Sequence, residues 1–306
     1  MYLKTLAKST TLTRIAIFLF FCLNSLSEPV WAQAPTGKIK EGKGSFDYIV
    51  TQSETKKIIP VYYYRPEGDV TKMPILFVMH GTNRNADTYR DNWVDLAKEY
   101  NVLIIVPEFS REYFPTSRQY NYGNIMTKEG VHIPKSEWSY TLIDPIFDTV
   151  VQDVQSNESA YDIFGHSAGS QFTHRFAIFL NQTKANRIVS ANAGTYTMPD
   201  FEVEFPFGLK GTICDQGCLR SAYAKKLVIQ LGKEDTDPNH KHLNTSDEAM
   251  KQGSHRLERG HNFYERSQSI AKKHGWKFNW SIRQVPGVGH DNRGMAIDAA
   301  EYLYGK

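Results

Sequence analysis

Residues 161–171, which read YDIFGHSAGSQ, decide the fold of this 306-residue chain. Ala160–Phe164 reads as a short buried strand, Gly165–Gly169 as a sharp turn, and Gln171–Leu180 as a helix with apolar residues at helical spacing. In a Gly-x-Ser-x-Gly turn between a strand and a helix, the serine takes a strained backbone conformation and its hydroxyl stays exposed above the sheet. The sequence therefore predicts that Ser167 is a nucleophile.

Strands and helices alternate along the rest of the chain, which predicts an α/β fold. We expect a mostly parallel, twisted sheet of about eight strands with helices on both faces, an antiparallel hairpin at one edge and a small loop or cap insert. The expected strands are Ser45–Gln52, Lys57–Arg65, Pro74–Met79, Val102–Val106, Ala160–Phe164, Arg187–Ala191, Lys226–Gly232 and Phe278–Val285. The expected helices cover Tyr89–Tyr100, Leu142–Val154, Gln171–Leu180, Leu257–Lys273 and Met295–Tyr304.

The first 32 residues are typical of a secretory signal peptide. They have a basic start and an apolar run over Ile15–Leu26, which is shorter than the roughly 20 residues that a membrane-spanning helix needs. We expect cleavage after Ala32, a flexible leader over residues 33–44, and a single domain over residues 45–306. These features predict a secreted or periplasmic protein with no membrane attachment after cleavage.

The composition fits one soluble domain with a sizeable core, because 41% of the residues are hydrophobic and 23% are charged. The formal net charge is only +3, and the basic residues form no stripe. A nucleic-acid partner is therefore not expected. The oligomeric state is left open.

Two cysteines, Cys214 and Cys218, remain once the predicted signal peptide is removed. In an oxidising compartment, an even pair at this spacing favours a disulfide that closes a short loop, with two free thiols as the alternative. A metal site would need further ligands, and the neighbouring residues include no histidine and no other cysteine. We therefore expect no metal.

A serine nucleophile needs a histidine base and a carboxylate that orients it. The strand over 226–231 is followed by Gly-Lys-Glu-Asp-Thr-Asp, in which Asp235 is the preferred acid, Asp237 the second choice and Glu234 the third. The last strand is followed by a tight loop that ends at His290, the expected base. All of these residues follow strands, whose carboxyl ends meet at one edge of a parallel sheet.

The intermediate of acyl transfer also needs backbone donors for its oxyanion. One expected donor is the N–H of Ala168, directly after the nucleophile. The other is the N–H of Thr82, or alternatively of Gly81, in the loop after an early strand. His80, in the same loop, is expected to be structural.

Four motifs carry a resemblance to a known family: FVMHGT at 77–82, GHSAG at 165–169, GKED at 232–235 and PGVGH at 286–290. Together they resemble the α/β-hydrolase superfamily over nearly the whole mature chain, and most closely its exported esterase and polyhydroxybutyrate-depolymerase-like branch. The resemblance implies a serine hydrolase that cleaves carboxylic esters, small-molecule or polymeric, through an acyl-enzyme intermediate and without a cofactor. A peptidase or an acyltransferase with the same triad, and a non-catalytic binding protein, remain alternatives.

Two long irregular stretches, 109–139 and 195–224, should lie over the same edge and set specificity. They could form an aromatic pocket wall or simply pack onto the domain; the candidate wall residues are Tyr113, Tyr122, Trp138 and Tyr196. Other polar residues are expected on the surface: His240 and His242 in a solvated loop, His174 on a helix, and Arg256 and Arg259 as helix surface charge.

Overall fold

Eight strands form one sheet in the computed structural model, which describes residues 1, 37–52 and 54–305. Their order is β1-β2-β4-β3-β5-β6-β7-β8; β1 and β2 form an antiparallel hairpin, β2 is antiparallel to β4, and the remaining pairs are parallel. This confirms the predicted sheet with its hairpin edge. The strands are β1 Gly42–Gln52, β2 Thr55–Arg65, β3 Ile75–Met79, β4 Leu103–Pro107, β5 Tyr161–His166, β6 Ala185–Ala191, β7 Lys226–Gly232 and β8 Ser281–Val285.

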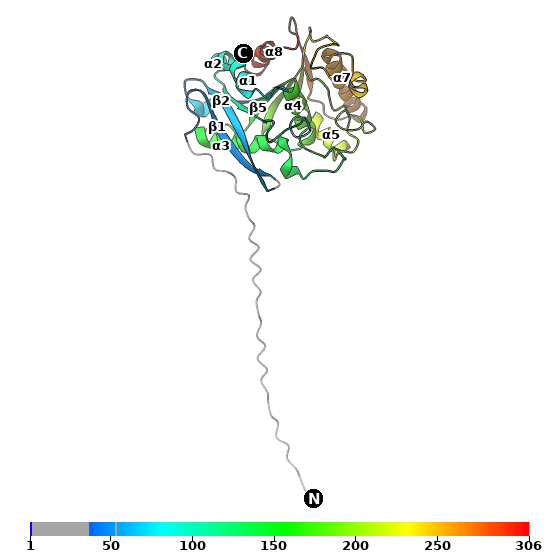
Figure 1. Cartoon of the computed structure of the whole chain (residues 1–306), viewed down its shortest axis with the longest axis horizontal. Helices are drawn as coiled ribbons and strands as arrows, with labels where there is room; N and C mark the ends of the chain where they lie inside the picture. The colour runs from blue at the N-terminus through cyan, green and yellow to red at the C-terminus, as the bar shows by residue number, and fades with distance from the viewer. Residues whose placement is uncertain (2–36, 53, 306) are drawn as a thin grey trace. The chain divides into compact units, whose positions relative to one another are not determined.

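Helices cover both faces of the sheet, and Figure 1 shows α1, α2 and α8 together on one side and α3 on the other. The helix α5 lies inside a stretch that was expected to be irregular. The helices are α1 Ala86–Asn92, α2 Val94–Tyr100, α3 Ile143–Val154, α4 Ala168–Phe179, α5 Gln216–Tyr223, α6 Asp247–Met250, α7 Arg256–His274 and α8 Asn292–Tyr304. Short 3-10 turns occur at Val70–Lys72, Lys135–Glu137 and Ser139–Leu142.

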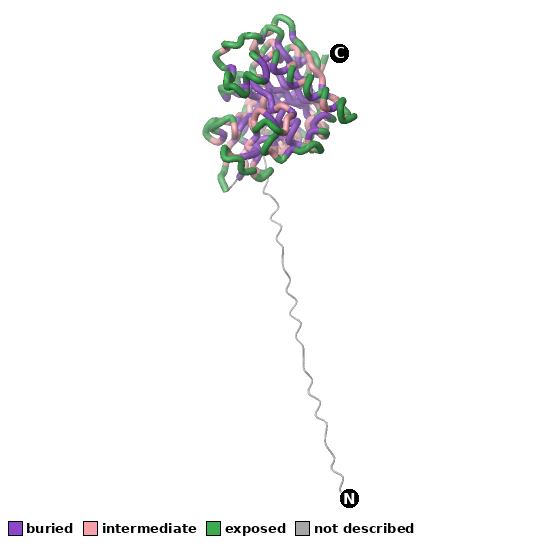
Figure 2. Tube along the Cα trace, turned by 90° about the vertical axis from the view of Figure 1, so that its right-hand side faces the viewer, coloured by how far each residue is buried: buried purple, intermediate pink, exposed green. Residues whose placement is uncertain are grey.

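The central strands are buried on both sides because successive side chains point to opposite faces. On β3, Phe77 joins the core cluster that contains Phe172 of α4, whereas Val78 joins a second cluster that contains Trp93 and Met295. Figure 2 shows the result, a buried interior under an exposed outer layer of loops. The continuous apolar runs in the sequence are explained by this two-sided burial.

The turn after β5 has the strained geometry that the sequence predicts. Ser167 has φ 59° and ψ −114°, a conformation that non-glycine residues rarely adopt. A Cβ atom on Gly165 would lie 2.2 Å from the carbonyl oxygen of Gly169, and a Cβ atom on Gly169 would lie 2.0 Å from that of Met79. Only glycine therefore lets α4 start this close to β3 and β5.

The described part of the predicted leader is bound to the domain rather than flexible. The carboxylate of Asp153 accepts hydrogen bonds from the backbone N–H groups of Lys38 and Ile39, and the Ile39 side chain is buried in the core. The strand β1 begins at Gly42, three residues before the expected start. The predicted signal peptide lies outside the described residues.

A disulfide precedes and enters α5. Cys214 and Cys218 are joined by a disulfide at the start of α5, with 5.3 Å between their Cα atoms, as the sequence predicts.

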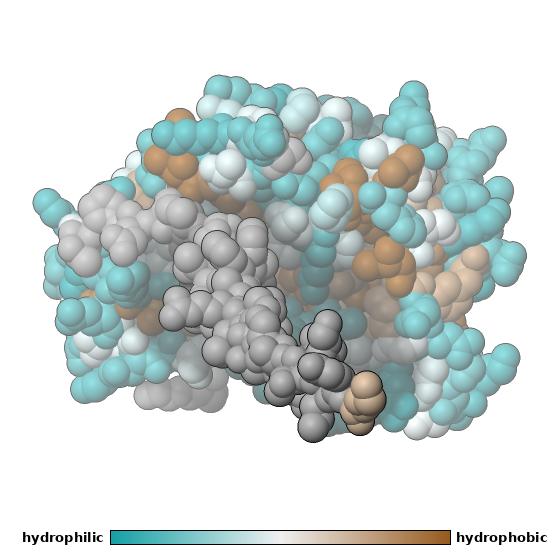
Figure 3. Space-filling view, turned by 90° about the horizontal axis from the view of Figure 1, so that it is seen from below, coloured by the Kyte–Doolittle hydropathy of each residue, from teal (hydrophilic) through white to brown (hydrophobic). Residues whose placement is uncertain are grey.

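On the face in Figure 3, hydrophobic residues appear in separate groups between hydrophilic side chains. Among the described residues, no helix combines the length and apolar character needed to cross a membrane.

Replacing Gly169 with alanine is expected to lower the free energy of unfolding by about 2 kcal/mol or more, because the new methyl group would collide with backbone rather than with a side chain that can move. Urea denaturation measures this. Gly289→Ala is the matched control, since its Cβ would have its nearest neighbour at 3.5 Å, an ordinary contact. Equal stability of the two variants would contradict the packing argument.

Candidate active site

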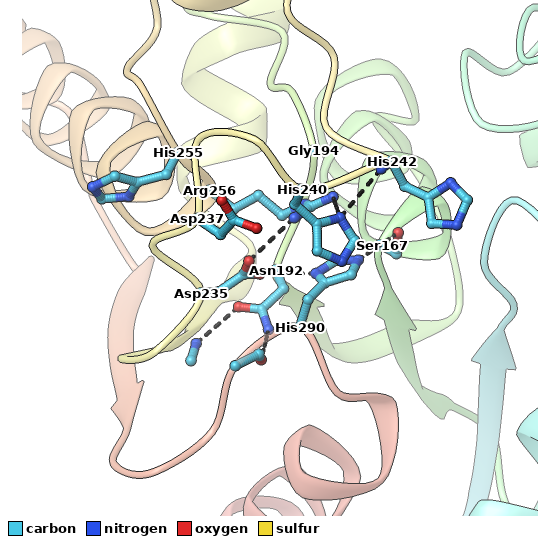
Figure 4. Close-up of polar contacts among 12 residues, drawn as sticks. Ser167, Asn192, Gly194, Asp235, Asp237, His240, His242, His255, Arg256 and His290 are labelled. Carbon is cyan, nitrogen blue, oxygen red and sulfur yellow. Dashed lines mark hydrogen bonds and ion pairs between the residues drawn. The ribbon is translucent and has the colours of Figure 1, made fainter.

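Three residues that the sequence predicts are brought together at the carboxyl edge of the sheet. His290 Nε2 lies 3.1 Å from Ser167 Oγ, and His290 Nδ1 lies 2.8 Å from Asp235 Oδ2 (Figure 4). Asp235 is buried, whereas His290 is partly exposed next to the nucleophile. The chain from hydroxyl to imidazole to carboxylate has the distances that proton transfer from a serine requires.

The loops that carry Asp235 and His290 are held together by Asn192, the first residue after β6. Its side chain accepts a hydrogen bond from Gly232 N–H at 2.8 Å and donates one to the carbonyl oxygen of Gly289 at 2.9 Å (Figure 4). One carboxamide therefore spans the end of β7 and the loop before the histidine. This fixes the separation of the two loops.

The second and third choices for the acid lie elsewhere. Asp237 is exposed, and its carboxylate accepts a hydrogen bond from the backbone N–H of Asn239 at 2.8 Å. Glu234 is also exposed. The geometry places only Asp235, of the three acidic side chains, against the imidazole.

Arg256, at the start of α7, is a residue of the site that sequence reasoning missed. It was expected on the surface, but its side chain is 1% exposed and its Nη1 donates to Asp235 Oδ1 at 3.2 Å. Its Nη2 lies 3.2 Å from His240 Nδ1, and the His240 ring stands edge-on to His290 with 5.2 Å between centroids. Figure 4 shows His240 between Arg256 and His242. The predicted solvated loop thus contributes a histidine that contacts the site.

Burial and positive neighbours lower the pKa values of the two imidazoles that flank His290, those of His240 and His166. Desolvation lowers the pKa of His240, and the charges of Arg256 and His290 lower it further. On the other side, the His166 ring lies 4.7 Å from that of His290, and burial holds the pKa of His166 well below its ordinary value. The His290 ring therefore contacts two imidazoles whose charged forms are disfavoured.

The loop after β3 approaches the nucleophile. Gly81 and Thr82 line the same cavity as Ser167 and His290, and Ala168 is the first residue of α4, so its N–H has no carbonyl partner within the helix. His80 is buried; its Nδ1 lies 3.0 Å from Gly81 O, its Nε2 accepts from Phe109 N–H at 3.0 Å, and burial lowers its pKa to about 3. These contacts suit the structural role expected of His80.

The four aromatic residues proposed for a pocket wall do not gather around Ser167. Trp138 and Tyr196 are fully buried in the core, where Tyr196 stacks on Phe263. Tyr122 lies against the Arg175 guanidinium, and Tyr113 lines a different cavity. The long loops use these side chains mainly to pack onto the domain, which was the other possibility that the sequence left open.

Two other residues expected on the surface are buried. His174 of α4 is enclosed, with Nδ1 2.9 Å from Ser170 O and Nε2 accepting from Thr197 N–H at 3.1 Å. Arg259 donates to the carbonyl oxygens of Gly253 and Gly194. Backbone carbonyls of distant loops satisfy these polar groups, so both residues are structural. Among the described residues, no group of three or more His, Cys, Asp or Glu side chains is arranged to hold a metal ion.

Solved structures resemble the chain over most of its length. A poly(aspartic acid) hydrolase from Sphingomonas sp. KT-1 is 42% identical with a TM-score of 0.83, covering 87% of this chain and 100% of its own. A poly(3-hydroxybutyrate) depolymerase from Bordetella parapertussis is 31% identical with a TM-score of 0.82, covering 87% and 90%. An S-formylglutathione hydrolase from Agrobacterium tumefaciens shares the fold at 16% identity, with a TM-score of 0.55 over 85% and 92%. No family model and no curated protein sequence matches the chain.

Removing Arg256 should be costly for stability, because it leaves the buried carboxylate of Asp235 without its cation. Arg256→Leu is expected to lower the free energy of unfolding by about 3–5 kcal/mol, as for other broken buried pairs. Urea denaturation of Arg256→Leu, Asp235→Leu and the double variant measures the free energy of unfolding. The double variant should recover part of the stability that Arg256→Leu loses. A change within about 0.5 kcal/mol, typical of surface substitutions, would contradict this role.

Proposed function

The chain belongs to the α/β-hydrolase superfamily, in its esterase and polyhydroxybutyrate-depolymerase-like branch, and from that membership we propose that it is a serine hydrolase that cleaves carboxylic ester bonds. The observation that carries the proposal is the hydrogen-bonded series Ser167, His290 and Asp235, with Ser167 in the strained turn after β5. The solved relatives include a poly(aspartic acid) hydrolase and a poly(3-hydroxybutyrate) depolymerase, which supports hydrolysis as the class of reaction here.

The mechanism follows from the order of the contacts. His290 Nε2 takes the proton of Ser167 as Oγ attacks the ester carbonyl, and the same nitrogen then protonates the departing alcohol. Water, activated by His290, hydrolyses the acyl-enzyme. Asp235 holds the imidazole in the required tautomer and stabilises its charged form. The N–H groups of Ala168 and Thr82 bind the oxyanion.

Arg256 acts in this mechanism as a positioning residue. It occupies one oxygen of the Asp235 carboxylate while His290 occupies the other, so the carboxylate cannot rotate away from the imidazole. A lysine at this position would keep the charge but lose the second contact, to His240, because an ammonium group lacks the planar fork of a guanidinium.

We also propose that the mature enzyme works outside the cytoplasm, in the periplasm or the medium. The disulfide between Cys214 and Cys218 supports this, because disulfides persist in oxidising compartments. The predicted signal peptide points in the same direction.

Covalent labelling tests the triad. Purified mature protein should react with a fluorophosphonate probe at Ser167, and Ser167→Ala should abolish labelling. His290→Ala and Asp235→Asn should lower kcat for a nitrophenyl ester at least about 1000-fold, whereas Asp237→Asn is the matched control and should stay within about threefold of wild type. Absence of labelling in folded wild-type protein would refute the hydrolase mechanism.

Hydrolysis of a polyamide is a second candidate, favoured by the 42% identity to the poly(aspartic acid) hydrolase. Poly(aspartic acid) is joined by amide bonds, which the same acyl-enzyme chemistry can cleave. Incubation with poly(aspartic acid) and with poly(3-hydroxybutyrate), followed by mass spectrometry of the soluble products, distinguishes polyamide hydrolysis from polyester hydrolysis. We expect Ser167-dependent release of short fragments from at least one polymer. Release from neither would restrict the activity to small esters.

A further inference from the structure

A small cavity opens beside the nucleophile, and its wall is unusually rich in carboxamides. It has a volume of about 250 Å³, and its lining includes Ser167 and the three histidines His166, His242 and His290. The rest of the lining comes from the loop after β3, from α1 and from the first residue of α8. These segments contribute four asparagines, Asn83, Asn85, Asn92 and Asn292, together with Thr82 and Thr88. We call this cavity the asparagine pocket.

The wall of the asparagine pocket suits a polar, uncharged group. It includes no lysine, arginine, aspartate or glutamate, and its one aromatic residue besides histidine is Tyr89. A hydrocarbon chain placed here would strip water from several amides and return no hydrogen bonds, which costs free energy for every group left unpaired. A charged group would find no fixed opposite charge.

The carboxamide of Asn292 stands out in this lining, because its Oδ1 and its Nδ2 are both buried without a hydrogen-bond partner in the described part of the chain. Asn85 and Asn92 are half-buried and Asn83 is exposed, and no hydrogen bond joins their side chains to another described residue. By contrast, the side chains of Asn124, Asn192, Asn262 and Asn279 each donate to a backbone carbonyl. Buried polar groups are almost always paired in proteins, so the unpaired carboxamide of Asn292 beside Ser167 is a feature to be explained by a ligand.

Accepting that the chain is a serine hydrolase, we propose that the asparagine pocket binds an amide group of the substrate next to the scissile bond. An amide brings one N–H donor and one carbonyl acceptor, which complement carboxamides that offer both. The small volume fits a single amide-bearing unit rather than a long chain. The natural substrate is therefore of a class that carries amides, whichever bond is cleaved.

Matched esters test the proposal by turnover. The first pair is the ethyl esters of N-acetyl-β-alanine and of hexanoic acid, which have equal chain length and differ by one amide in the acyl part. The second pair, 2-acetamidoethyl acetate and pentyl acetate, places the amide in the alcohol part. We expect wild type to favour the amide member of at least one pair by tenfold or more in kcat/KM, about the value of one net hydrogen bond.

Variants then locate the preference. Asn292→Leu and Asn92→Leu keep the approximate side-chain shape, and each should reduce the preference about tenfold by slowing only the amide member. The control is Asn181→Leu, an exposed asparagine after α4 at the opposite edge of the sheet, which should leave both members unchanged. Equal turnover of both members by wild type, or equal losses for both in the variants, would overturn the proposal.

Binding to protein that carries Ser167→Ala separates this inference from the proposed function. N-acetyl-β-alanine methylamide should give saturation-transfer NMR signals with Ser167→Ala and lose them when Asn292→Leu is added, whereas heptane-1,7-diol, of similar length but without an amide, should bind neither. That result supports the pocket even if wild-type protein is not labelled at Ser167. Binding that is insensitive to Asn292→Leu, or no binding while labelling of Ser167 succeeds, would reject the asparagine pocket and leave the hydrolase intact.

Discussion

The contact of main chain against main chain at the start of α4 sets the geometry of the carboxyl edge. Gly169 passes the carbonyl oxygen of Met79 so closely that a Cβ atom would lie 2.0 Å from it, and the N–H of Ser167 donates to Ala191 O on β6. The Ser167 turn is thus held by β3 on one side and by β6 on the other. Its unfavourable φ costs about 1–3 kcal/mol, and the surrounding buried strands offset that cost. Because the loop after β3 begins at His80, the same contact brings the expected oxyanion donors beside Ser167.

The site also depends on a carboxylate buried away from water. Desolvation of Asp235 would be expensive, and the structure offsets it with two partners on its two oxygens, His290 and Arg256. Since Arg256 is the first residue of α7, the position of that helix is tied to Asp235. The carboxamide of Asn192 adds a neutral link between the same loops. The positions of Asp235 and His290 are therefore fixed by groups from two other segments, Arg256 of α7 and Asn192 after β6.

Sequence reasoning found what is encoded locally. The strand, the Gly-x-Ser-x-Gly turn and the helix are adjacent in the chain, and Asp235 and His290 each follow a strand end, so their meeting at one edge follows from a parallel sheet. Arg256 was missed because a charged residue on a largely polar helix is indistinguishable from surface charge until its partner, 21 residues away, is known. The burial of Trp138 and Tyr196 could not be predicted for a similar reason. An aromatic residue in a loop can cover the core or line a cavity, and only tertiary packing decides between the two.

That packing decides what surrounds the nucleophile. The aromatic residues of the long loops fill the space between those loops and α4, where Tyr120 and Tyr140 pack against Phe172. Because these side chains are buried in the core, they do not line the cavity at Ser167. The cavity at Ser167 is left to residues of α1, α8 and the loop after β3, most of which have short polar side chains. These residues lie mostly outside the motifs that build the triad, so they can change without disturbing it. The proposed triad of Ser167, His290 and Asp235 thus accounts for the reaction class, while the polarity of this cavity depends on positions that a motif search does not examine. Substrate preference can therefore diverge between enzymes that share the same catalytic geometry.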